Sequence, residues 1–381
     1  MTGPLSGVKV LEIAGIGPGP FCGMLLADLG ADVVRVDRPG GGGMQLVPWA
    51  SDLLNRGKRS IAVDLTKPGG AETVLSLVEH ADILFEGFRP GVAERLGIGP
   101  EPCFLRRAQL IYGRMTGWGQ DGPIAHTAGH DITYIAPTGA LHAIGQAGGP
   151  PQIPLNLVGD FAGGSMYLVV GMLAALDETR RSGRGQVVDA AIVDGAAHLM
   201  TMIYSCYAAG VWSDERGTNL GDGGSPFYGI YQTSDAKFMA VGALEPQFYA
   251  EFLRLLELPS DPAAQFDRDA WPQLRAKIDA AFAARPQHEW AKRFSDSDAC
   301  VAPVLGMSDA PGHPQLAARN TFFVDNGITQ PSPAPRFSRT PTRVDAPPCV
   351  PGQHTDEVLA DWLNRALTRT EPADTVKNSQ I

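Results

Sequence analysis

Residues 9–37 read KVLEIAGIGPGPFCGMLLADLGADVVRVD. KVLEI (Lys9–Ile13) and DVVRVD (Asp32–Asp37) are short apolar-rich runs typical of buried strands, and FCGMLLADL (Phe21–Leu29) is typical of a helix that ends at Gly30. Strand-like and helix-like segments continue to alternate in SIAVDL (60–65), a helical stretch over 70–80, ADILFE (81–86) and QLIYGRM (109–115). This alternation predicts an α/β fold with a Rossmann-like, doubly wound parallel sheet that carries helices on both faces.

The composition is that of an ordinary globular protein, with 44% hydrophobic and 19% charged residues in 381. No run approaches the roughly 18 consecutive apolar residues of a membrane span, and no secretory or peroxisomal signal stands out, so we expect a cytoplasmic protein without a membrane partner. The net charge of −10, with no block of basic residues, argues against a nucleic-acid partner. Five cysteines without a CxxC or CxxH pair predict neither a metal site nor a disulfide framework.

The second half of the chain has a different texture. Long helices are predicted over Phe161–Arg181 and Ala190–Ala209, and the glycine-rich stretch 221–229 marks a boundary. Tyr228–Thr233 and Lys237–Val241 then predict a β-hairpin. The remaining predictions are helices near 247–257, 271–283 and 287–295, a strand over 298–305, a proline-rich strap over 331–352, and a last helix over 354–367 before a disordered polar tail.

These patterns predict an inserted smaller α+β domain. The predicted parts are a large α/β domain (1–195), a linker helix and loop (196–224), the small α+β domain (225–310), and a return strap with a C-terminal helix that packs on the large domain (311–381).

GIGPGP followed by Asp37 suggests dinucleotide binding at first sight. The Rossmann fingerprint needs G-x-G-x-x-G/A, whereas here Gly15 and Gly17 are followed by Pro20, and Gly19 comes one place too early. The pattern therefore disfavours a nicotinamide oxidoreductase.

A set of motifs in a fixed order carries a more specific signal. They are ADLGADVVRVDRPG (27–40), NRGKRSIAVDL (55–65), EGFRPGVAERLGIGP (86–100), YGRMTGWGQDGP (112–123), AGHDITYIAPTGALHAIG (128–145), NLVGDFAGGS (156–165), GQVVDAAIVDG (185–195), GALEPQFY (242–249) and SDACVAPVL (297–305). Together they cover nearly the whole chain, which resembles the α-methylacyl-CoA racemase family of the class III CoA-transferase superfamily. The run PGGGGMQLVPW (39–49) departs from that pattern at the loop expected near CoA.

The resemblance implies an isomerase that interconverts (2R)- and (2S)-2-methylacyl-CoA thioesters in fatty acid metabolism. His130 in the GHD motif and Asp160 would form the acid–base pair, Glu245 would orient the imidazole, and Asp131 would support it. The resemblance also implies an interlocked homodimer in which Glu245 comes from the partner. No metal and no separate cofactor are implied, because CoA is part of the substrate.

CoA-binding residues are carried over in the same way. Arginine suits the phosphates of CoA because its planar fork donates paired hydrogen bonds. The residues that the resemblance assigns to CoA are Arg38, Val63, Asp64, Leu65, Thr66, Gly87, Phe88, Arg89, Arg95, Met115, Gly129 and Tyr134. Lys58 and Arg59 are weaker candidates, since a basic turn is usually only solvated.

Inversion at the carbon beside a thioester carbonyl needs two acid–base groups on opposite faces of a planar enolate. Histidine fits one role because its pKa lies near neutrality, and a carboxyl fits the other if burial raises its pKa. Each residue also has a structural interpretation: Asp160 as the N-cap of the helix after it, His130 as a helix-start residue hydrogen-bonded in the core, and Glu245 as a first-turn acid. Met200 and Met202 could face an acyl chain, but core packing is favoured for them.

Other functions remain open. The main alternative is a class III CoA transferase in which Asp160 is a covalent nucleophile, although that mechanism does not need His130. A CoA-binding protein without catalysis would leave the acid–base pair idle. The acyl chain itself is not fixed by the sequence, so branched fatty acyl, sterol side-chain and 2-arylpropionyl thioesters all fit.

Overall fold

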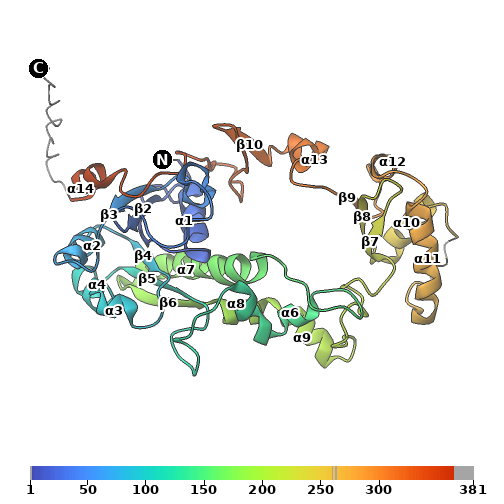
Figure 1. Cartoon of the computed structure of the whole chain (residues 1–381), viewed down its shortest axis with the longest axis horizontal. Helices are drawn as coiled ribbons and strands as arrows, with labels where there is room; N and C mark the ends of the chain where they lie inside the picture. Colours follow the sequence, from blue (N-terminus) through green and yellow to red (C-terminus); the bar gives the residue numbers. More distant parts are fainter. Residues whose placement is uncertain (1, 260, 262–263, 364–381) are drawn as a thin grey trace, which may run out of the picture. The chain divides into compact units, whose positions relative to one another are not determined.

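The computed structural model describes residues 2–259, 261 and 264–363, and the chain divides into two compact units (Figure 1). The first unit holds the residues up to Ala128, Asp160–Asp194 and the residues from Phe323 onward. The second unit holds Gly129–Gly159 and Gly195–Phe322. The chain thus crosses from the first unit to the second between Ala128 and Gly129, and returns to the first between Gly159 and Asp160.

A six-stranded sheet forms the centre of the first unit, with strand order β3-β2-β1-β4-β5-β6 and parallel pairing throughout. The strands are β1 (Lys9–Ile13), β2 (Asp32–Asp37), β3 (Arg59–Ala62), β4 (Ile83–Glu86), β5 (Ile111–Thr116) and β6 (Gln186–Ala191). The predicted α/β architecture with a parallel sheet is confirmed. The chain winds outward in opposite directions from β1 and β4, which makes the gap between them the switch point where ligands of such sheets bind.

Helices cover both faces of this sheet. Side chains on a strand alternate between the two faces, so the strands are buried on both sides. Leu11 and Ile13 belong to a large apolar core with residues from α2 (Gly70–Val78), α4 (Pro100–Arg106) and α14 (Thr355–Leu363). Further helical residues of this core come from the short α3 (Val92–Arg95). The hydrophobic runs of the strands are explained by this two-sided burial.

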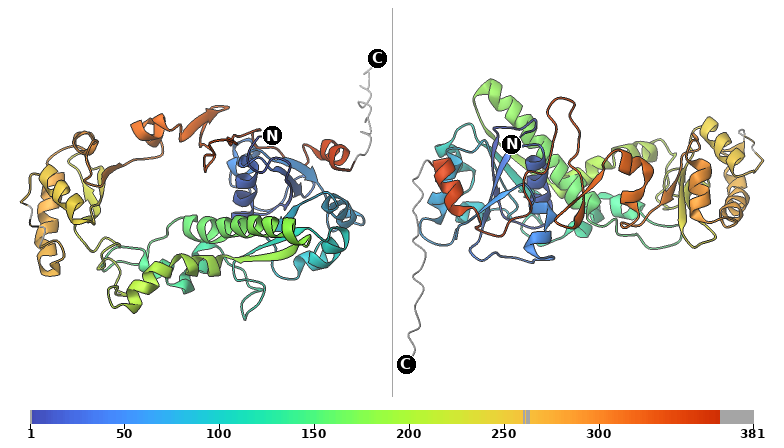
Figure 2. Two further views of the ribbon diagram at one scale, coloured as in Figure 1. Left: turned by 180° about the vertical axis from the view of Figure 1, so that it is seen from behind. Right: turned by 90° about the horizontal axis from the view of Figure 1, so that it is seen from above.

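The opposite face is covered by α1 (Pro18–Asp28) and α7 (Tyr167–Ser182), which contact one another and lie over β1, β2, β5 and β6 (Figure 2). α7 lies so close to the sheet that a Cβ at Gly113 of β5 would be 2.9 Å from both Met172 Sδ and Phe85 Cβ. Glycine is therefore required at that position of the strand.

The helix that carries Asp160 begins earlier than the sequence indicated. η4 (Leu157–Met166) is a π-helix that runs directly into α7, so Asp160 is not an N-cap residue but lies inside the first part of the helix. By length and composition the combined helix Leu157–Ser182 could cross a membrane. Its α7 part packs on β5 and β6 of the sheet.

The second unit contains a helical part and a three-stranded antiparallel sheet. Its helices include α5 (Asp131–Ile135), α6 (Ala140–Ala143), α9 (Thr201–Ala208), α10 (Pro246–Leu255), α11 (Trp271–Phe282) and α12 (Gln287–Phe294). The sheet has the order β7-β8-β9, with β7 (Tyr228–Gln232), β8 (Phe238–Gly242) and β9 (Val301–Val304). The predicted hairpin is thus confirmed.

One predicted helix is divided. The stretch 190–209 forms α8 (Ile192–Leu199) and α9, separated at Met200, rather than a single helix. No residue of α9 is buried, and Met202 is 71% exposed. The favoured core-packing interpretation of Met202 is therefore wrong for the single chain, whereas Met200 packs beside a small core cluster.

The C-terminal segment returns to the first unit. After α13 (Pro314–Ala318) come β10 (Phe322–Asp325) and β11 (Ile328–Pro331), which pair with each other. The irregular strap that follows reaches the free edge of β3, where Gly57 N donates to Ala346 O and Ala62 N donates to Thr355 Oγ1. α14 ends at Leu363 among the described residues, so the rest of the predicted helix and the polar tail lie outside them.

The docking of α14 should depend on Trp362. This side chain is 1% exposed, and its Nε1 donates to Asp32 Oδ2 at 2.9 Å. Trp362→Ala should lower the free energy of unfolding by about 3–5 kcal/mol, because it empties part of the core. Urea unfolding would measure this, with Leu105→Ala, at an 82% exposed site, as the control. A change of less than about 1 kcal/mol for Trp362→Ala would mean that α14 is not part of the folded core.

Candidate functional site

The predicted CoA-binding segments of the first unit lie at one edge of the sheet. Arg38 follows β2, Val63–Thr66 follow β3, and Gly87–Arg89 follow β4. Because the strands are parallel, all of these segments emerge at their carboxyl edge, where open α/β sheets bind ligands. Arg38 and Arg89 are exposed, so their guanidinium groups are accessible to a phosphate.

Not every predicted CoA residue offers its side chain. Met115 is 2% exposed and Val63 is 8% exposed, so these two could meet a ligand mainly through the backbone. Asp64 accepts hydrogen bonds from Thr66 Oγ1 at 2.6 Å and Thr66 N at 2.9 Å, which fixes the turn after β3 and lowers the pKa of Asp64. Arg95, at the end of α3, is exposed, and its Nη1 lies near Gly91.

The Asp160 carboxyl, in η4, lies against the N-terminus of α1, the helix that follows β1. A Cβ at Gly17, the N-cap residue of α1, would be 2.9 Å from Asp160 Oδ2. Ser165 Oγ donates to Pro18 O at 2.7 Å and to Asp160 O at 3.0 Å. The N-terminus of α1 carries a positive partial charge, so it favours negative charge at this carboxyl.

One glycine of the GIGPGP turn has a clear structural role. Gly17 has φ +71°, and the group that approaches it is the Asp160 carboxyl. A Cβ at Gly15 or Gly19 would meet nothing within 4 Å. Gly17 thus makes room for the Asp160 carboxyl.

His130 stands at the other crossing between the units. It is exposed and caps α5, with its N–H donating to Thr133 Oγ1 at 2.9 Å. The alternative of a histidine buried in the core is therefore wrong. Tyr134 Oη donates to Gly129 O, and its ring leaves no room for a Cβ at Gly129, so this glycine serves the local packing of the GHD motif.

Asp131 packs the GHD motif against the NLVGD motif. It is 8% exposed, and its carboxyl packs so closely on Gly159 that a Cβ there would overlap with Asp131 Oδ2. Gly159 is the residue before Asp160. The GHD and NLVGD motifs therefore meet through Asp131 and Gly159, which gives Asp131 a packing role that the sequence did not reveal.

Glu245 is exposed and occupies the N-cap position of α10, ahead of Pro246. Among the described residues of the single chain, no hydrogen bond or ion pair joins Glu245 to His130. Its proposed orientation of an imidazole stays a prediction. The described residues also contain no group of three or more His, Cys, Asp or Glu side chains arranged to hold a metal ion.

Sequence reasoning missed Glu86, the last residue of β4. It is 3% exposed, and one carboxyl oxygen accepts a hydrogen bond from Phe88 N at 2.6 Å, within the predicted CoA loop. Burial raises the pKa of Glu86 to about 7, against the opposing effects of that hydrogen bond and of Arg114. An acidic residue that ends the apolar run ADILFE was the available signal.

Lys58 and Arg59 also differ from expectation. Lys58 is 1% exposed and its Nζ pairs with Glu12 Oε2 at 2.6 Å, so it is a core residue and not part of a solvated turn. Arg59 pairs with Asp32 at 2.6 Å and with Asp361 of α14 at 2.9 Å. Neither side chain is available to a phosphate.

Glu86 should make stability depend on pH. An unfolded glutamate has a pKa of about 4.3, so the folded chain, with its raised value, binds this proton more tightly. The resulting stabilisation is complete below the unfolded pKa and is lost as the pH rises through about 7. The unfolding free energy of Glu86→Gln minus that of the wild type should therefore grow by about 2–3 kcal/mol between pH 5 and 8.

Urea unfolding at several pH values would test this, with the exposed Glu101→Gln as the matched control. If the difference in unfolding free energy between Glu86→Gln and the wild type stays constant from pH 5 to 8, the pKa of Glu86 is not raised.

The chain has named relatives over most of its length. The chain is 45% identical over 362 residues to a Mus musculus protein named alpha-methylacyl-CoA racemase, covering 94% of this chain and 93% of the relative. The Homo sapiens protein of the same name is 42% identical with the same coverage. An acetyl-CoA:oxalate CoA-transferase of Acetobacter aceti is 30% identical over 343 residues, which cover 86% of this chain and 88% of the relative.

A solved structure and a family match point to the same group of proteins. A crystal structure of a CAIB/BAIF family protein from Brucella suis superposes with a TM-score of 0.79 at 26% identity, covering 95% of this chain and 100% of that one. Residues 5–355 match the family described as CoA-transferase family III. The family match and the identity to the named relatives together show that the chain belongs to CoA-transferase family III.

Proposed function

We propose that this protein interconverts (2R)- and (2S)-2-methylacyl-CoA thioesters by proton transfer at C2 through an enolate, with His130 and Asp160 as the acid–base pair. The observation that carries this proposal is the contact of Asp131 with Gly159, which joins the GHD motif to the aspartate motif. The relatives named alpha-methylacyl-CoA racemase, at 42–45% identity over 94% of the chain, support it.

The chemistry needs one base and one acid at any moment. In one direction His130 removes the C2 proton while Asp160, protonated, delivers a proton to the opposite face; in the other direction the roles are exchanged. Each group is worth about 10²–10⁴ in rate as a general acid or base. The exposed His130 can exchange its proton with solvent between turnovers.

CoA would lie along the carboxyl edge of the sheet. Arg38, Arg89 and Arg95 supply positive charge for its phosphates, and the turn at Val63–Thr66 and the loop at Gly87–Phe88 supply backbone groups. CoA enters as part of the substrate, so no separate cofactor is required. We propose branched fatty acid metabolism as the setting, since 2-methylacyl chains are its intermediates.

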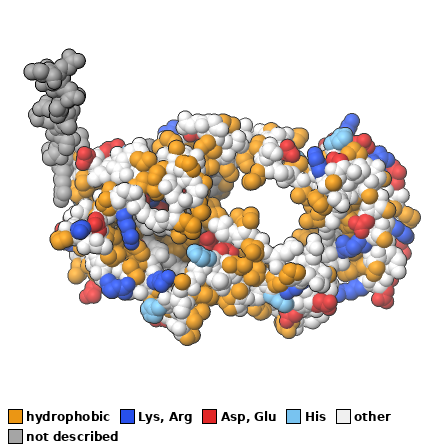
Figure 3. Space-filling model, viewed as in Figure 1, with side chains coloured by type: hydrophobic (Ala, Val, Ile, Leu, Met, Phe, Trp, Pro, Cys, Tyr) orange, Lys and Arg blue, Asp and Glu red, His pale blue; other side chains and the backbone are white. Residues whose placement is uncertain are grey.

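We further propose an interlocked homodimer in which Glu245 of the partner subunit would orient His130. Support comes from apolar side chains exposed on and after α9 in the second unit (Figure 3). Met202, Tyr204, Tyr207 and Val211 are each more than half exposed, a density of apolar surface that monomers rarely leave uncovered. A second copy would cover them.

A CoA transferase is the second candidate, because relatives in the family carry that name. In that reaction the Asp160 carboxylate attacks the thioester and forms a mixed anhydride, which releases the CoA thiolate. Asp160 is half-buried at the N-terminus of α1 and could serve either reaction. His130 is unexplained in the transferase reaction, which favours the racemase.

The decisive test incubates each epimer of a 2-methylacyl-CoA in D₂O and follows chirality and α-deuterium by NMR. The wild type should invert C2 with deuterium uptake. His130→Ala and Asp160→Asn should each slow inversion at least about 100-fold. Each variant should also keep deuterium exchange with retention from only one epimer, because one base remains.

His126→Ala and Asp177→Asn are matched controls, since both residues are exposed and lie in the same segments of chain. Absence of exchange in the wild type, together with CoA transfer to an added carboxylate, would establish the transferase instead.

CoA binding should depend on the two arginines after β2 and β4. Arg38→Ala and Arg89→Ala should each weaken the Kd for free CoA about 10- to 100-fold, because a charge-assisted hydrogen bond is worth about 1.5–3 kcal/mol. Isothermal titration calorimetry would measure this, with Arg254→Ala on α10 as the control. Unchanged affinity in both variants would place the nucleotide elsewhere.

A further inference from the structure

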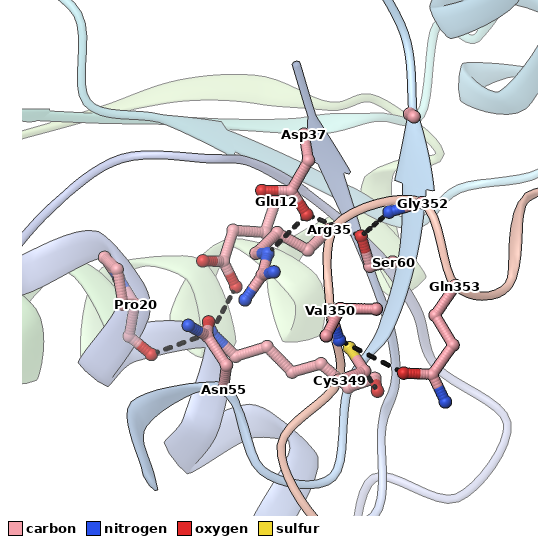
Figure 4. A network of polar contacts seen from close by, with 12 residues as sticks. Glu12, Pro20, Arg35, Asp37, Asn55, Ser60, Cys349, Val350, Gly352 and Gln353 are labelled. Carbon is pink, nitrogen blue, oxygen red and sulfur yellow. Dashed lines mark hydrogen bonds and ion pairs between the residues drawn. The ribbon is translucent and has the colours of Figure 1, made fainter. Parts of the chain in front are cut away.

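A cluster of buried polar groups lies between the sheet and α1, and the reaction as proposed does not use it (Figure 4). Glu12 of β1 and Lys58 form an ion pair whose side chains are both 0% exposed. Lys58 Nζ also donates to Asn55 Oδ1 at 3.2 Å and to Pro20 O, in the first turn of α1, at 2.9 Å. We call Glu12, Pro20, Asn55 and Lys58 the Lys58 cluster.

We propose that Lys58 is a positioning residue for Asp160: it fixes the first turn of α1, and that turn fixes the aspartate. This inference rests on the proposed racemase function. Lys58 does not touch the substrate in this scheme, because its side chain is enclosed by protein.

The contacts between Lys58 and Asp160 form a continuous path. Lys58 Nζ donates a hydrogen bond to Pro20 O on the side of α1 that faces the sheet. α1 also packs directly on the ion pair, since any Cβ at Gly23 would overlap with Glu12 and come within 2.8 Å of Lys58 Nζ. Above, the same turn of α1 receives the hydrogen bond from Ser165 to Pro18.

The path ends at the aspartate itself. The rings of Phe21 and Phe161 stack with centroids 4.5 Å apart, and Gly17 lies against the Asp160 carboxyl. The first turn of α1 is thus held on one side by Lys58 and holds Asp160 on the other. A shift of this turn changes the direction in which the carboxyl points.

A buried ion pair is a poor means of stabilisation, because two charges lose their hydration. Burial raises the pKa of Glu12 and lowers that of Lys58, so the fold works against both charges. Lys58 instead supplies three directed hydrogen-bond donors, which an apolar side chain cannot replace. Lys58 is also held through its backbone, where its carbonyl accepts from Cys349 Sγ.

The chain offers a matched control at the other end of α1. Arg56 Nη2 pairs with Asp28, the last residue of α1, at 2.6 Å, and these side chains are 4% and 3% exposed. Arg56→Met and Lys58→Met each remove one buried cation that anchors α1. Only the second lies beneath the turn that contacts Asp160.

The test measures deuterium exchange from each epimer separately, with Asp160→Asn showing which epimer depends on the aspartate. Lys58→Met should slow exchange from that epimer, and inversion, about 10-fold or more, while exchange from the other epimer and the KM stay within about 2-fold. Arg56→Met should leave all rates within about 2-fold, even where both variants lower the Tm equally.

Equal slowing of both epimers, or equal effects of Lys58→Met and Arg56→Met, would overturn the positioning role and leave the racemase intact. A wild type without exchange would remove both proposals. Should Lys58→Met fail to fold, the double variant Glu12→Gln/Lys58→Met, which leaves no unpaired buried carboxylate but still lacks the bond to Pro20, should give the same one-sided loss. Unchanged exchange ratios in this double variant would contradict the proposal.

Discussion

The site depends on one close approach, between the first turn of α1 and the helix that carries Asp160. Gly17 provides the space for the carboxyl, Ser165 hydrogen-bonds across the contact, and the stacked Phe21 and Phe161 fill the space beside it. The sheet and α7 support this contact. The N-terminus of α1 follows β1 at the switch point of the parallel sheet, and α7 holds the adjoining π-helix against the sheet. The carboxyl edge of the sheet also presents the arginines.

Asp160 lies in a π-helix, and this has a physical consequence. Hydrogen bonds from residue i to i+5 widen the helix and are rare outside functional sites, because their packing is poorer than that of an α-helix. Here the wide turn begins in the second unit at Leu157 and ends at Met166, just before α7. The irregular helix therefore bridges the crossing between the units and places Asp160 immediately after it.

The sequence predicted elements well where the signal is local. The strands Lys9–Ile13 and Asp32–Asp37 have the expected bounds, because an apolar run between turn residues is sufficient to define a buried strand. Prediction from the sequence failed where contacts with residues distant along the chain determine the structure. Lys58 is buried because it pairs with Glu12 and donates to Pro20 of α1, and Asp160 is not an N-cap because it lies inside a π-helix that begins at Leu157. Glu86 was missed because burial, and not residue type, raises its pKa.

The strap along β3 joins parts of the chain that are far apart in the sequence and are therefore synthesised at different times. Ser60 N donates to His354 Nδ1 across a separation of 294 residues, and this contact helps to cover the outer edge of the sheet. An uncovered edge strand is a template for pairing with other chains. While the ribosome still holds the C-terminal part, β3 has no such cover. A nascent or truncated chain that lacks the strap should therefore be prone to aggregate, which gives the last part of the sequence a protective role unrelated to catalysis.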